Sequence, residues 1–500
     1  MPVAVAHGAV CVGMTGQVIE VQVHLSNGLP GMTIVGLPDT SINESRDRVR
    51  SAVVNSGFEW PAGRITVGLS PAFEHKRGSG LDFAVAMAVL AGNETVTDRQ
   101  VAGTVFVGEL GLDGSVRGTP GAVAMALGVA RTPAMERIFA SRATAAQIAR
   151  VPGVAVIPVD SLTEAVEVLR GARDVPDPPP VPERFPDGAF PELADVQGQA
   201  LACRALEVAA AGGHHILMNG PPGVGKTMLA QRLPGLLPPL TDEQVLEVAA
   251  IRDALDGSGD SVTRVPPFCA PHHSASHVAL VGGAVGAATR PGQITLAHHG
   301  VLFLDEAPEF SRMTLECLRQ PLEEGTVGIA RAAVTERLPA QFQLVLAANP
   351  CPCGEERACQ CTSVEVRRYR ARLSGPLLDR VDLRIRLAAS RASTPAPSSL
   401  VVRERVHRAR ERARARLEPL GYLLNARVPP GLLRTELAPT APGAAAMRRY
   451  SEQAGWSRRA ADRILRVAWT VADLAGLDRP DTDAIDEAVL LRNRATEVRR

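Results

Sequence analysis

The sequence predicts an α/β fold: a parallel β-sheet covered by helices, preceded by a second α/β region and followed by a helical region. In the middle of the chain, short apolar stretches typical of buried strands alternate with helical segments, which is the pattern of a parallel sheet with helices on both faces. The proline-rich residues 174–191 separate this part from the one before it. A stretch rich in Ser, Ala and Pro at 389–399 separates it from the helical part that follows.

Length and composition agree with a globular protein of several domains. Five hundred residues are enough for two to four domains, and 45% hydrophobic and 21% charged residues are ordinary values. A net charge of +1 excludes a uniformly basic coat for nucleic acid but leaves local patches open. The chain shows no charged-then-apolar leader and no apolar stretch of membrane-spanning length. We therefore expect a cytoplasmic protein without a membrane partner, with its eight cysteines mostly reduced.

The boundaries and the local patterns predict the following elements. The expected segments are an α/β domain at 1–172, a linker at 173–191, a sheet-containing core at 192–395 and a helical domain at 396–500. In the first domain we expect strands at 18–24 and 64–69 and helices at 84–91 and 121–129. In the core we expect strands at 215–219, 301–304, 343–348 and 381–387. The C-terminal part shows an arginine-rich run at 403–416 and an amphipathic region at 457–494.

A glycine-rich motif follows the strand expected at 215–219 and opens a helix expected at 228–233. It consists of Gly220, Pro221, Pro222, Gly223, Val224, Gly225, Lys226 and Thr227, followed by Met228, and it matches the P-loop pattern G-x-x-x-x-G-K-[ST] in full. Glycines let backbone N–H groups approach phosphates, and a helix N-terminus favours their negative charge. Lys226 is one of only two lysines in the chain, which indicates that this position needs a compact ammonium and not charge alone. We therefore predict an ATP site in which Lys226 reaches the β- and γ-phosphates and Thr227 ligates Mg²⁺.

Polar residues follow the next two expected strands of the core. Asp305 and Glu306 come directly after 301–304, at the carboxyl end where α/β sheets bind ligands. We expect Asp305 to hold the Mg²⁺ shell and Glu306 to polarise the attacking water. Asn349 ends the strand at 343–348 and is expected to orient that water, the alternative being a turn asparagine before a proline.

Arg380 lies just before the strand expected at 381–387. An arginine supplied across a subunit boundary can stabilise charge on the transferring phosphoryl group, which would require a ring of subunits. The alternative is a surface salt bridge.

At these residues the chain resembles an AAA+ ATPase, and in particular the magnesium-chelatase-like YifB/ComM group. Four segments carry the resemblance most specifically: 270–276, 291–306, 349–354 and 369–380. It covers nearly the whole length and implies an AAA+ P-loop NTPase core with magnesium-chelatase-type insertions, an N-terminal Lon-protease-like α/β domain and a C-terminal helical lid. It also implies two pore-facing hairpins, one including 292–299 and one at about 325–338 with Arg331 near its tip, and a second sensor at Arg459.

The front domain resembles the Lon-type protease fold through residues 75–82 and 107–114. Aligned by its glycines, the first segment puts Gly80 where Lon-type enzymes carry the serine nucleophile, and 118–124 contains no lysine that could act as the base. We therefore expect a non-proteolytic scaffold or substrate-binding module. The second lysine of the chain, Lys76, receives no role.

Two sets of residues remain open between a functional and a structural interpretation. Four thiols lie within eleven residues and could hold structural Zn²⁺, although their C-x-C spacing is tighter than usual and unliganded cysteines are the alternative: Cys351, Cys353, Cys359 and Cys361. The run at 403–416 has seven arginines and two glutamates, and it is either a phosphate-contacting surface or a solvated lid helix. For the histidine pairs at 272–273 and 298–299 we expect packing or polar contacts rather than a metal.

For function, the resemblance implies a hexameric DNA helicase that drives branch migration in recombination or natural transformation, with single-stranded or branched DNA as its partner. Two alternatives stay open. One is a chelatase-like ATPase that remodels a protein partner, and the other is a residual Lon-like peptidase.

Overall fold

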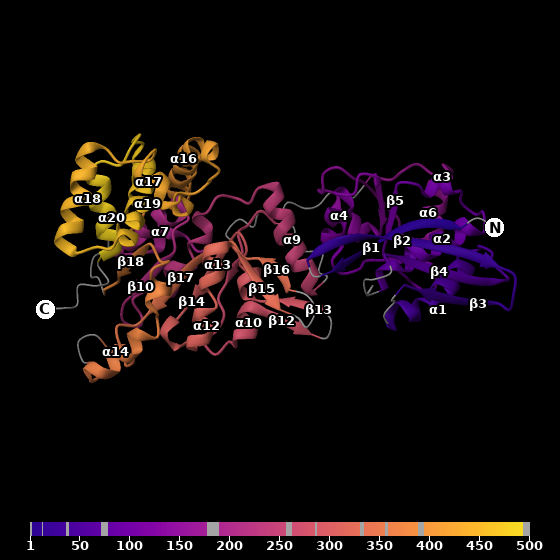
Figure 1. Ribbon diagram of the computed structural model, residues 1–500, viewed down its shortest axis with the longest axis horizontal. Coiled ribbons are helices and arrows are strands. Elements are labelled where there is room, and N and C mark those ends of the chain that lie inside the picture. The colour runs from indigo at the N-terminus through magenta and orange to yellow at the C-terminus, as the bar shows by residue number, and fades with distance from the viewer. Residues whose placement is uncertain are drawn as a thin grey trace. The chain divides into compact units, whose positions relative to one another are not determined.

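The computed structural model describes residues 3–12, 14–36, 40–71, 79–177, 190–256, 263–285, 288–330, 335–355, 359–388 and 395–493. Lys76, Arg331 and the middle of the proline-rich linker lie outside these residues. The chain divides into two compact units (Figure 1). One comprises 1–184, 241–264 and 285–290, and the other comprises 185–240, 265–284 and 291–500.

The first unit is built on a mixed seven-stranded sheet. Its strands in spatial order are β3 (Gly31–Val35), β4 (Arg64–Ser70), β2 (Thr15–Ser26), β1 (Ala4–Val12), β5 (Thr104–Val107), β8 (Arg137–Ala140) and β9 (Ala155–Pro158). Strand β1 pairs antiparallel with β2 and parallel with β5. A small hairpin is formed by β6 (Glu109–Leu110) and β7 (Val116–Arg117). The strands predicted at 18–24 and 64–69 are confirmed as parts of β2 and β4.

The helices of the first unit are α1 (Thr40–Asn55), α2 (Asp82–Gly92), α3 (Asp98–Val101), α4 (Ala122–Ala130), α5 (Arg142–Ile148), α6 (Leu162–Leu169) and α9 (Asp242–Asp256). Helices α2 and α4 pack directly on the sheet, and α1 packs against α2. Helix α2 is buried from its first residue to Ala91, because its sequence is apolar on every face. Its one charged residue, Asp82, pairs with Arg48 at 2.8 Å, and burial raises the pKa of the Asp82 carboxyl to about 6.

Helix α9 lies in the sequence between the P-loop and the predicted Asp-Glu pair, yet it belongs to the first unit. It packs against α4, where the Asp253 Oδ2 accepts a hydrogen bond of 3.0 Å from the Val123 backbone N–H. Since sequence patterns describe only local structure, they did not indicate this grouping.

The second unit is built on a parallel sheet, as predicted, and the sheet has five strands. Its strands in spatial order are β11 (Phe268–Cys269), β14 (Val301–Leu304), β17 (Gln343–Ala348), β10 (Ile216–Asn219) and β18 (Leu383–Arg386). The helices that accompany the sheet are α7 (Ala200–Gly212), α8 (Lys226–Ala230), α10 (His277–Val281), α11 (Gln293–Leu296), α12 (Arg312–Glu316), α13 (Arg319–Glu324), α14 (Ser363–Ala371) and α15 (Gly375–Leu378). The four core strands predicted from apolar runs are therefore all present.

One of the two predicted hairpins is confirmed and the other is displaced. Strands β15 (Thr326–Ala330) and β16 (Thr335–Pro339) pair antiparallel, as expected for 325–338. Residues 292–299 do not form a hairpin strand: the earlier segments β12 (Gly282–Val285) and β13 (Ala288–Pro291) make the two-stranded sheet, and 293–296 is α11. The physical reason is that Ile294 and Thr295 are buried on a short helical turn.

The helical part after residue 396 is confirmed. It contains α16 (Ser399–Leu417), α17 (Pro430–Arg434), α18 (Ala441–Ala454), α19 (Arg458–Ala475) and α20 (Thr482–Asn493). Helices α16 and α19 both pack against α7. Among the described residues, no helix is both long and apolar enough to cross a bilayer.

Arginines of the run at 403–416 are largely used inside this unit. Arg405 forms an ion pair of 2.6 Å with Glu207, and Arg410 donates to a carbonyl of α7. Arg416 pairs with Asp473 at 2.6 Å and lies over the Trp469 ring. These contacts favour the lid-helix interpretation of the run over phosphate binding.

A buried polar network ties the sheet to α19. Asp382, just before β18, accepts from His214 Nδ1 at 2.9 Å and from Arg463 Nη1 at 2.8 Å. His214 Nε2 lies 2.7 Å from the Thr470 hydroxyl. Asp382 and His214 are buried, so these bonds are formed in a region of low dielectric constant.

Candidate functional site

Three neighbouring strands of the parallel sheet end at the same edge and carry the predicted ATP-site residues. Strand β10 leads into the P-loop, β14 leads into Asp305, and β17, which lies between them, leads into Asn349. This is the edge at which parallel α/β sheets bind ligands. Within the P-loop, Gly223 and Gly225 have φ angles of 74° and 97°, which glycine adopts without strain.

Lys226 occupies the centre of this site and is only 8% exposed. Its Nζ donates hydrogen bonds to the Gly220 carbonyl at 2.5 Å, the Pro221 carbonyl at 2.9 Å and the Asn349 Oδ1 at 2.9 Å. Burial lowers the pKa of the Lys226 ammonium, and the negative charges of Asp305 and Glu306 partly offset that effect. The Lys226 ammonium is thus surrounded by oxygen acceptors, and the phosphate oxygens of a bound nucleotide would add further acceptors of the same kind.

The Thr227 hydroxyl donates to Asp305 Oδ2 at 2.6 Å. Adjacent oxygens around an octahedral Mg²⁺ with bonds of about 2.1 Å lie roughly 3.0 Å apart. These two oxygens therefore fit neighbouring positions in a Mg²⁺ shell, one from the P-loop and one from the acidic strand end. The other Asp305 oxygen, Oδ1, accepts from the Glu306 backbone N–H at 2.9 Å, which fixes the orientation of the carboxylate.

Glu306 has a left-handed backbone conformation, with φ 49° and ψ 43°. This conformation is unfavourable for a non-glycine residue, and such strain is concentrated at functional sites. The half-exposed carboxylate of Glu306 lies 3.3 Å from His273 Nδ1. The motif at 270–276 thus places a side chain next to Glu306. This is a polar contact of the kind expected for the histidine pairs, but the sequence did not indicate Glu306 as the partner.

Two further histidines of these pairs, His272 and His298, also make polar contacts of the expected kind. His272 Nδ1 lies 2.8 Å from the Ser274 hydroxyl, and His298 Nδ1 accepts from the Gln341 backbone N–H at 3.0 Å.

Arg380 and Arg459 lie apart from these residues, in a second cavity of about 480 Å³. The described residues that line it are Arg319, Glu323, Pro376, Asp379, Arg380, Pro430, Arg459, Asp462, Arg463 and Arg466, and none of them belongs to the P-loop or to the acidic strand end. Arg380 pairs with Glu323 and donates to the Pro376 carbonyl at 2.6 Å. Its buried Nε finds no hydrogen-bond partner among the described residues.

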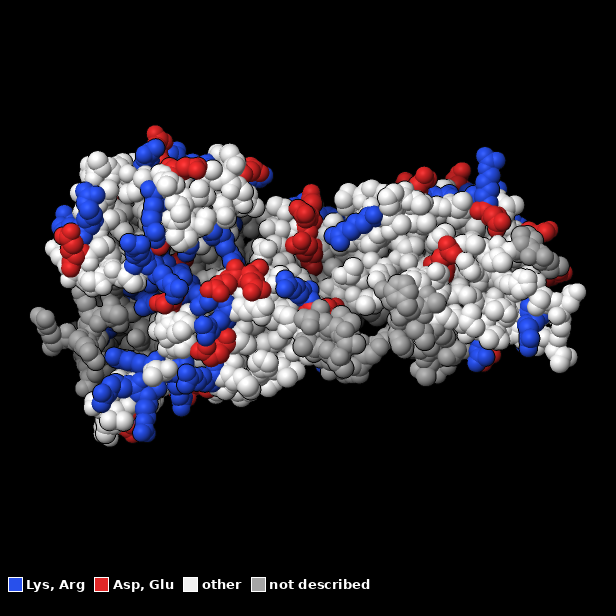
Figure 2. Space-filling view, in the orientation of Figure 1, with Lys and Arg blue, Asp and Glu red and all other residues white. Residues whose placement is uncertain are grey.

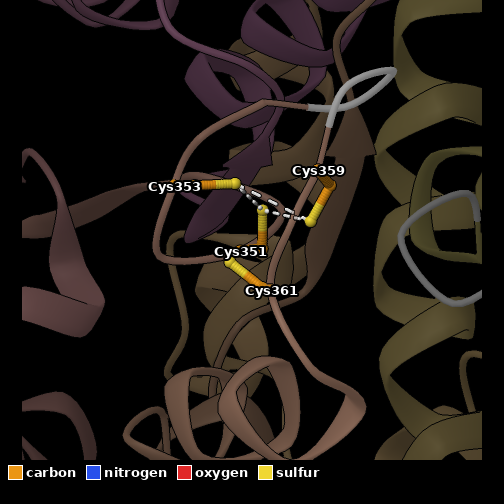
Figure 3. Close-up of side chains that lie close together, drawn as sticks. All are labelled: Cys351, Cys353, Cys359 and Cys361. Carbon is orange, nitrogen blue, oxygen red and sulfur yellow. Dashed lines mark hydrogen bonds between the residues drawn. The ribbon is translucent and has the colours of Figure 1, made fainter.

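The four cysteines after Asn349 come together, as Figure 3 shows. The sulfur separations are 3.3 Å for Cys351–Cys353, 3.7 Å for Cys353–Cys359 and 3.4 Å for Cys359–Cys351. Cys361 completes the group, and the four sulfurs lie within 4.8 Å of one another. A hydrogen bond from Cys351 lowers the pKa of the Cys353 thiol to about 6, whereas burial raises that of Cys351 to about 12.

In the front domain, Gly80 lies in a short 3₁₀ turn, Ser79–Leu81, that leads into α2. A Cβ at this position would lie 3.0 Å from Thr119 Oγ1 and 3.3 Å from Thr119 Cγ2. A serine here would therefore require Thr119 to shift by a few tenths of an ångström.

Family comparisons match three parts of the chain. A model described as magnesium chelatase, subunit ChlI, matches residues 192–394. Models described as subunit ChlI of Mg-chelatase and as its C-terminal part match residues 21–143 and 396–492.

Three relatives match almost from end to end. An uncharacterized protein of Mycobacterium tuberculosis is 45% identical over 489 residues, 96% of each chain. The uncharacterized protein YifB of Escherichia coli is 40% identical over 98% of this chain and 97% of its own. Competence protein ComM of Haemophilus influenzae is 37% identical over 95% of this chain and 94% of its own.

The P-loop, the acidic strand end and the helical lid on a parallel sheet define an AAA+ ATPase. The chain belongs to the magnesium-chelatase-like family of YifB and ComM. Its core carries the AAA+ fold, its front domain the Lon-like fold, and its C-terminal part the helical lid of that family.

Proposed function

We propose that the protein is a cytoplasmic, ATP-driven motor that assembles as a homo-hexamer and moves single-stranded or branched DNA in recombination or natural transformation. In this proposal Lys226 and the P-loop backbone hold the phosphates, and Thr227 and Asp305 hold Mg²⁺. Glu306 accepts a proton from the attacking water, and Asn349 orients that water. Zn²⁺ is the ion we assign to the cysteine group.

The observation that carries the hexamer is the separation of two predicted arginines from the ATP site of their own chain. Arg380 and Arg459 share a cavity whose described lining includes neither Lys226 nor Asp305. An arginine stabilises the transferring phosphoryl group only if it touches it. We therefore assign Arg380 and Arg459 to the ATP that is bound by a neighbouring subunit. A closed ring gives every subunit such a neighbour.

DNA as the substrate is supported by one relative and one surface. The relative ComM is named a competence protein. On α14 and just after it, four arginines are exposed, and Figure 2 shows basic side chains gathering over this helix: Arg367, Arg368, Arg370 and Arg372. Exposed arginines on one helix suit contacts to phosphates. We call these four residues the α14 patch.

The family match to a magnesium chelatase subunit favours a second candidate, an ATPase that remodels a protein partner. A residual Lon-like peptidase is the third, and the glycine at position 80 together with the absence of a lysine in 118–124 argues against it.

ATPase assays with and without single-stranded and forked DNA separate these functions. We expect DNA to stimulate hydrolysis several-fold, and Lys226→Ala to abolish both hydrolysis and strand movement. DNA strand movement that persists in the Lys226→Ala variant would not depend on ATP hydrolysis and would refute the motor proposal. No DNA binding at moderate salt would leave the protein-remodelling function in its place.

The α14 patch has its own test. Arg367→Ala with Arg368→Ala should weaken DNA binding and reduce the slope of log affinity against log salt by about 0.9 for each phosphate that the protein no longer neutralises. The matched control is Arg414→Ala, which removes an exposed arginine that pairs with Glu418 on the lid. Equal slopes for both variants would exclude the patch as the surface that binds DNA.

A further inference from the structure

The loop after β17 carries a cysteine group next to the ATP site. Cys351 is buried, Cys361 is partly exposed, and Cys353 and Cys359 are exposed. Figure 3 shows the four side chains pointing toward one another. All eight cysteines of the chain lie among the described residues, and none of them forms a disulfide bond there.

The sulfur positions suit one tetrahedral ion. With Zn–S bonds of about 2.3 Å, a tetrahedron places its sulfurs roughly 3.8 Å apart. The observed separations of 3.3–3.7 Å, with all four sulfurs within 4.8 Å, are close to that arrangement. They exceed by far the roughly 2.05 Å of a disulfide bond. Four thiolate ligands in one sphere favour Zn²⁺ over the oxygen-preferring Mg²⁺.

We propose that these cysteines bind one structural zinc ion, and that this ion holds the Asn349 loop against the P-loop. The cysteine group thereby becomes a brace of the nucleotide site. The binding of zinc stands on the sulfur geometry alone, whereas its effect on hydrolysis rests on the proposed ATPase function.

The first connection runs from the cysteines to the P-loop. Gly354 directly follows Cys353 and has a φ of 76°, and a Cβ at this position would lie 2.7 Å from Pro222 Cγ. The loop backbone therefore lies directly on the P-loop, in a conformation and at a distance that only glycine tolerates. Two residues before Cys351, Asn349 accepts the hydrogen bond from Lys226 at 2.9 Å.

The second connection runs to α14. Thr362 follows Cys361 and caps this helix, because its hydroxyl accepts from the Glu365 N–H at 3.3 Å while Glu365 accepts from the Thr362 N–H at 2.7 Å. On the same helix, Arg370 Nε donates to the Pro350 carbonyl at 3.3 Å, so α14 also contacts the residue that lies between Asn349 and Cys351.

These contacts give the metal a mechanical role. The ion joins the beginning of the loop, at Cys351, to its end, at Cys361. Helix α14, which follows that end, returns to the start of the loop through Arg370 and the Pro350 carbonyl, next to Asn349. Without the ion, the loop has more conformational freedom, and this freedom must be lost each time Asn349 takes its place for hydrolysis. We therefore expect loss of zinc to slow hydrolysis while Lys226 and Asp305 remain in place.

Metal analysis of the full-length protein tests the site. Elemental analysis should find about one zinc per chain, as for a closed Cys₄ site. Exchange for Co²⁺ should produce the charge-transfer and ligand-field bands of a tetrahedral tetrathiolate. Cys353→Ser with Cys359→Ser should lose the metal. Both residues are exposed, so the fold is expected to persist, and circular dichroism checks this. Cys11→Ala, in the front domain, is the matched control and should keep the zinc.

Hydrolysis is measured on the same samples. The double serine variant should lose about tenfold in ATPase rate and several degrees in melting temperature, whereas Cys11→Ala changes neither rate nor metal content. Lys226→Ala should be inactive yet fully loaded with zinc. If wild type hydrolyses no ATP but carries zinc, the proposed function fails and the metal site stands. Less than about 0.2 metal per chain, iron in place of zinc, or a disulfide between these cysteines would overturn the site. Zinc present with an unchanged rate in the serine variant would overturn the brace.

Discussion

Substitution of Asp382 by asparagine should uncouple the sheet from α19 and destabilise the second unit. The change preserves the side-chain volume and removes one acceptor and the negative charge. Asp382 is an ionised carboxylate that can only accept, so both His214 Nδ1 and Arg463 Nη1 donate to it, at 2.9 and 2.8 Å. An asparagine oxygen can serve one of these donors, and its NH₂ group then faces the other.

The magnitude follows from that geometry. Asp382 has a side-chain exposure of 3% and Arg463 one of 18%, so water replaces the missing partner poorly. A charge-assisted hydrogen bond left unmade costs about 1.5–3 kcal/mol, and breaking a buried ion pair costs about 3–5 kcal/mol. We expect the free energy of unfolding of the second unit to fall by about 3 kcal/mol, the lower end of the ion-pair range, because Arg463 retains some exposure.

The pH dependence provides an independent check on the same residue. Burial alone would raise the pKa of Asp382, but the hydrogen bond and charge of His214 and the charge of Arg463 hold it well below its usual value of 3.8. The folded pKa is thus lower than the unfolded one. The carboxylate therefore contributes stability that is fully present above about pH 3.8 and is lost as the pH falls below it. Asp382→Asn should lack this loss.

Urea denaturation followed by tryptophan fluorescence measures the effect. In a Trp60→Phe background, the remaining tryptophans lie in the second unit, at Trp456 and Trp469, so the signal reports on that unit. The control is Asp478→Asn, which removes a fully exposed carboxylate 3.4 Å from Arg412 and should leave the free energy of unfolding close to that of the wild type. A loss below about 1 kcal/mol for Asp382→Asn, or one equal to the control, would refute the buried-network reasoning.

Three further predictions concern catalysis and acid stability. Asn349→Ala should lower kcat at least about tenfold, because the side chain is assigned to orient the attacking water. The Kd for a fluorescent ATP analogue should change less than about threefold. A large loss of affinity with a normal kcat would contradict that role. The Arg380→Ala and Glu306→Gln proteins should each be inactive alone. A mixture of the two proteins should regain part of the ATPase rate, because one subunit supplies the arginine and its neighbour supplies the carboxylate. No recovery in the mixed assembly would argue against action across subunits. His215→Asn should flatten the dependence of stability on pH between pH 6.5 and about 3, because burial lowers the pKa of His215 to about 3 and the unfolded chain takes up a proton in this range. The asparagine Oδ1 can take the place of Nδ1 and accept the Leu344 N–H. A profile as steep as that of the wild type would show that another group titrates.

Several parts of this site were predictable because each is encoded within a few residues. The P-loop, the Asp305–Glu306 pair and Asn349 each follow a short apolar strand, and parallel strands must end at a common edge. The contacts between Lys226, Thr227, Asp305 and Asn349 agree with that placement. Their catalytic roles stay predictions until the variants are measured.

Other parts depended on contacts between distant residues. His273 reaches Glu306 across 33 positions, and Asp382 meets His214 across 168, so neither pair leaves a pattern in a local window. The displaced hairpin at 292–299 shows the same limit, because burial of Ile294 and Thr295 decided the local structure there.

The sequence by itself determined the fold class, the family and the strand ends at which the predicted nucleotide-site residues lie, because motifs and the periodicity of strands and helices are local properties of the chain. Only the tertiary structure decided which groups meet. It brought four sulfurs within 4.8 Å, laid Gly354 on the P-loop, and placed Arg380 and Arg459 in a cavity separate from Lys226. These outcomes follow from how the strands and helices pack around their cores, and packing is a property of the whole chain rather than of any short segment.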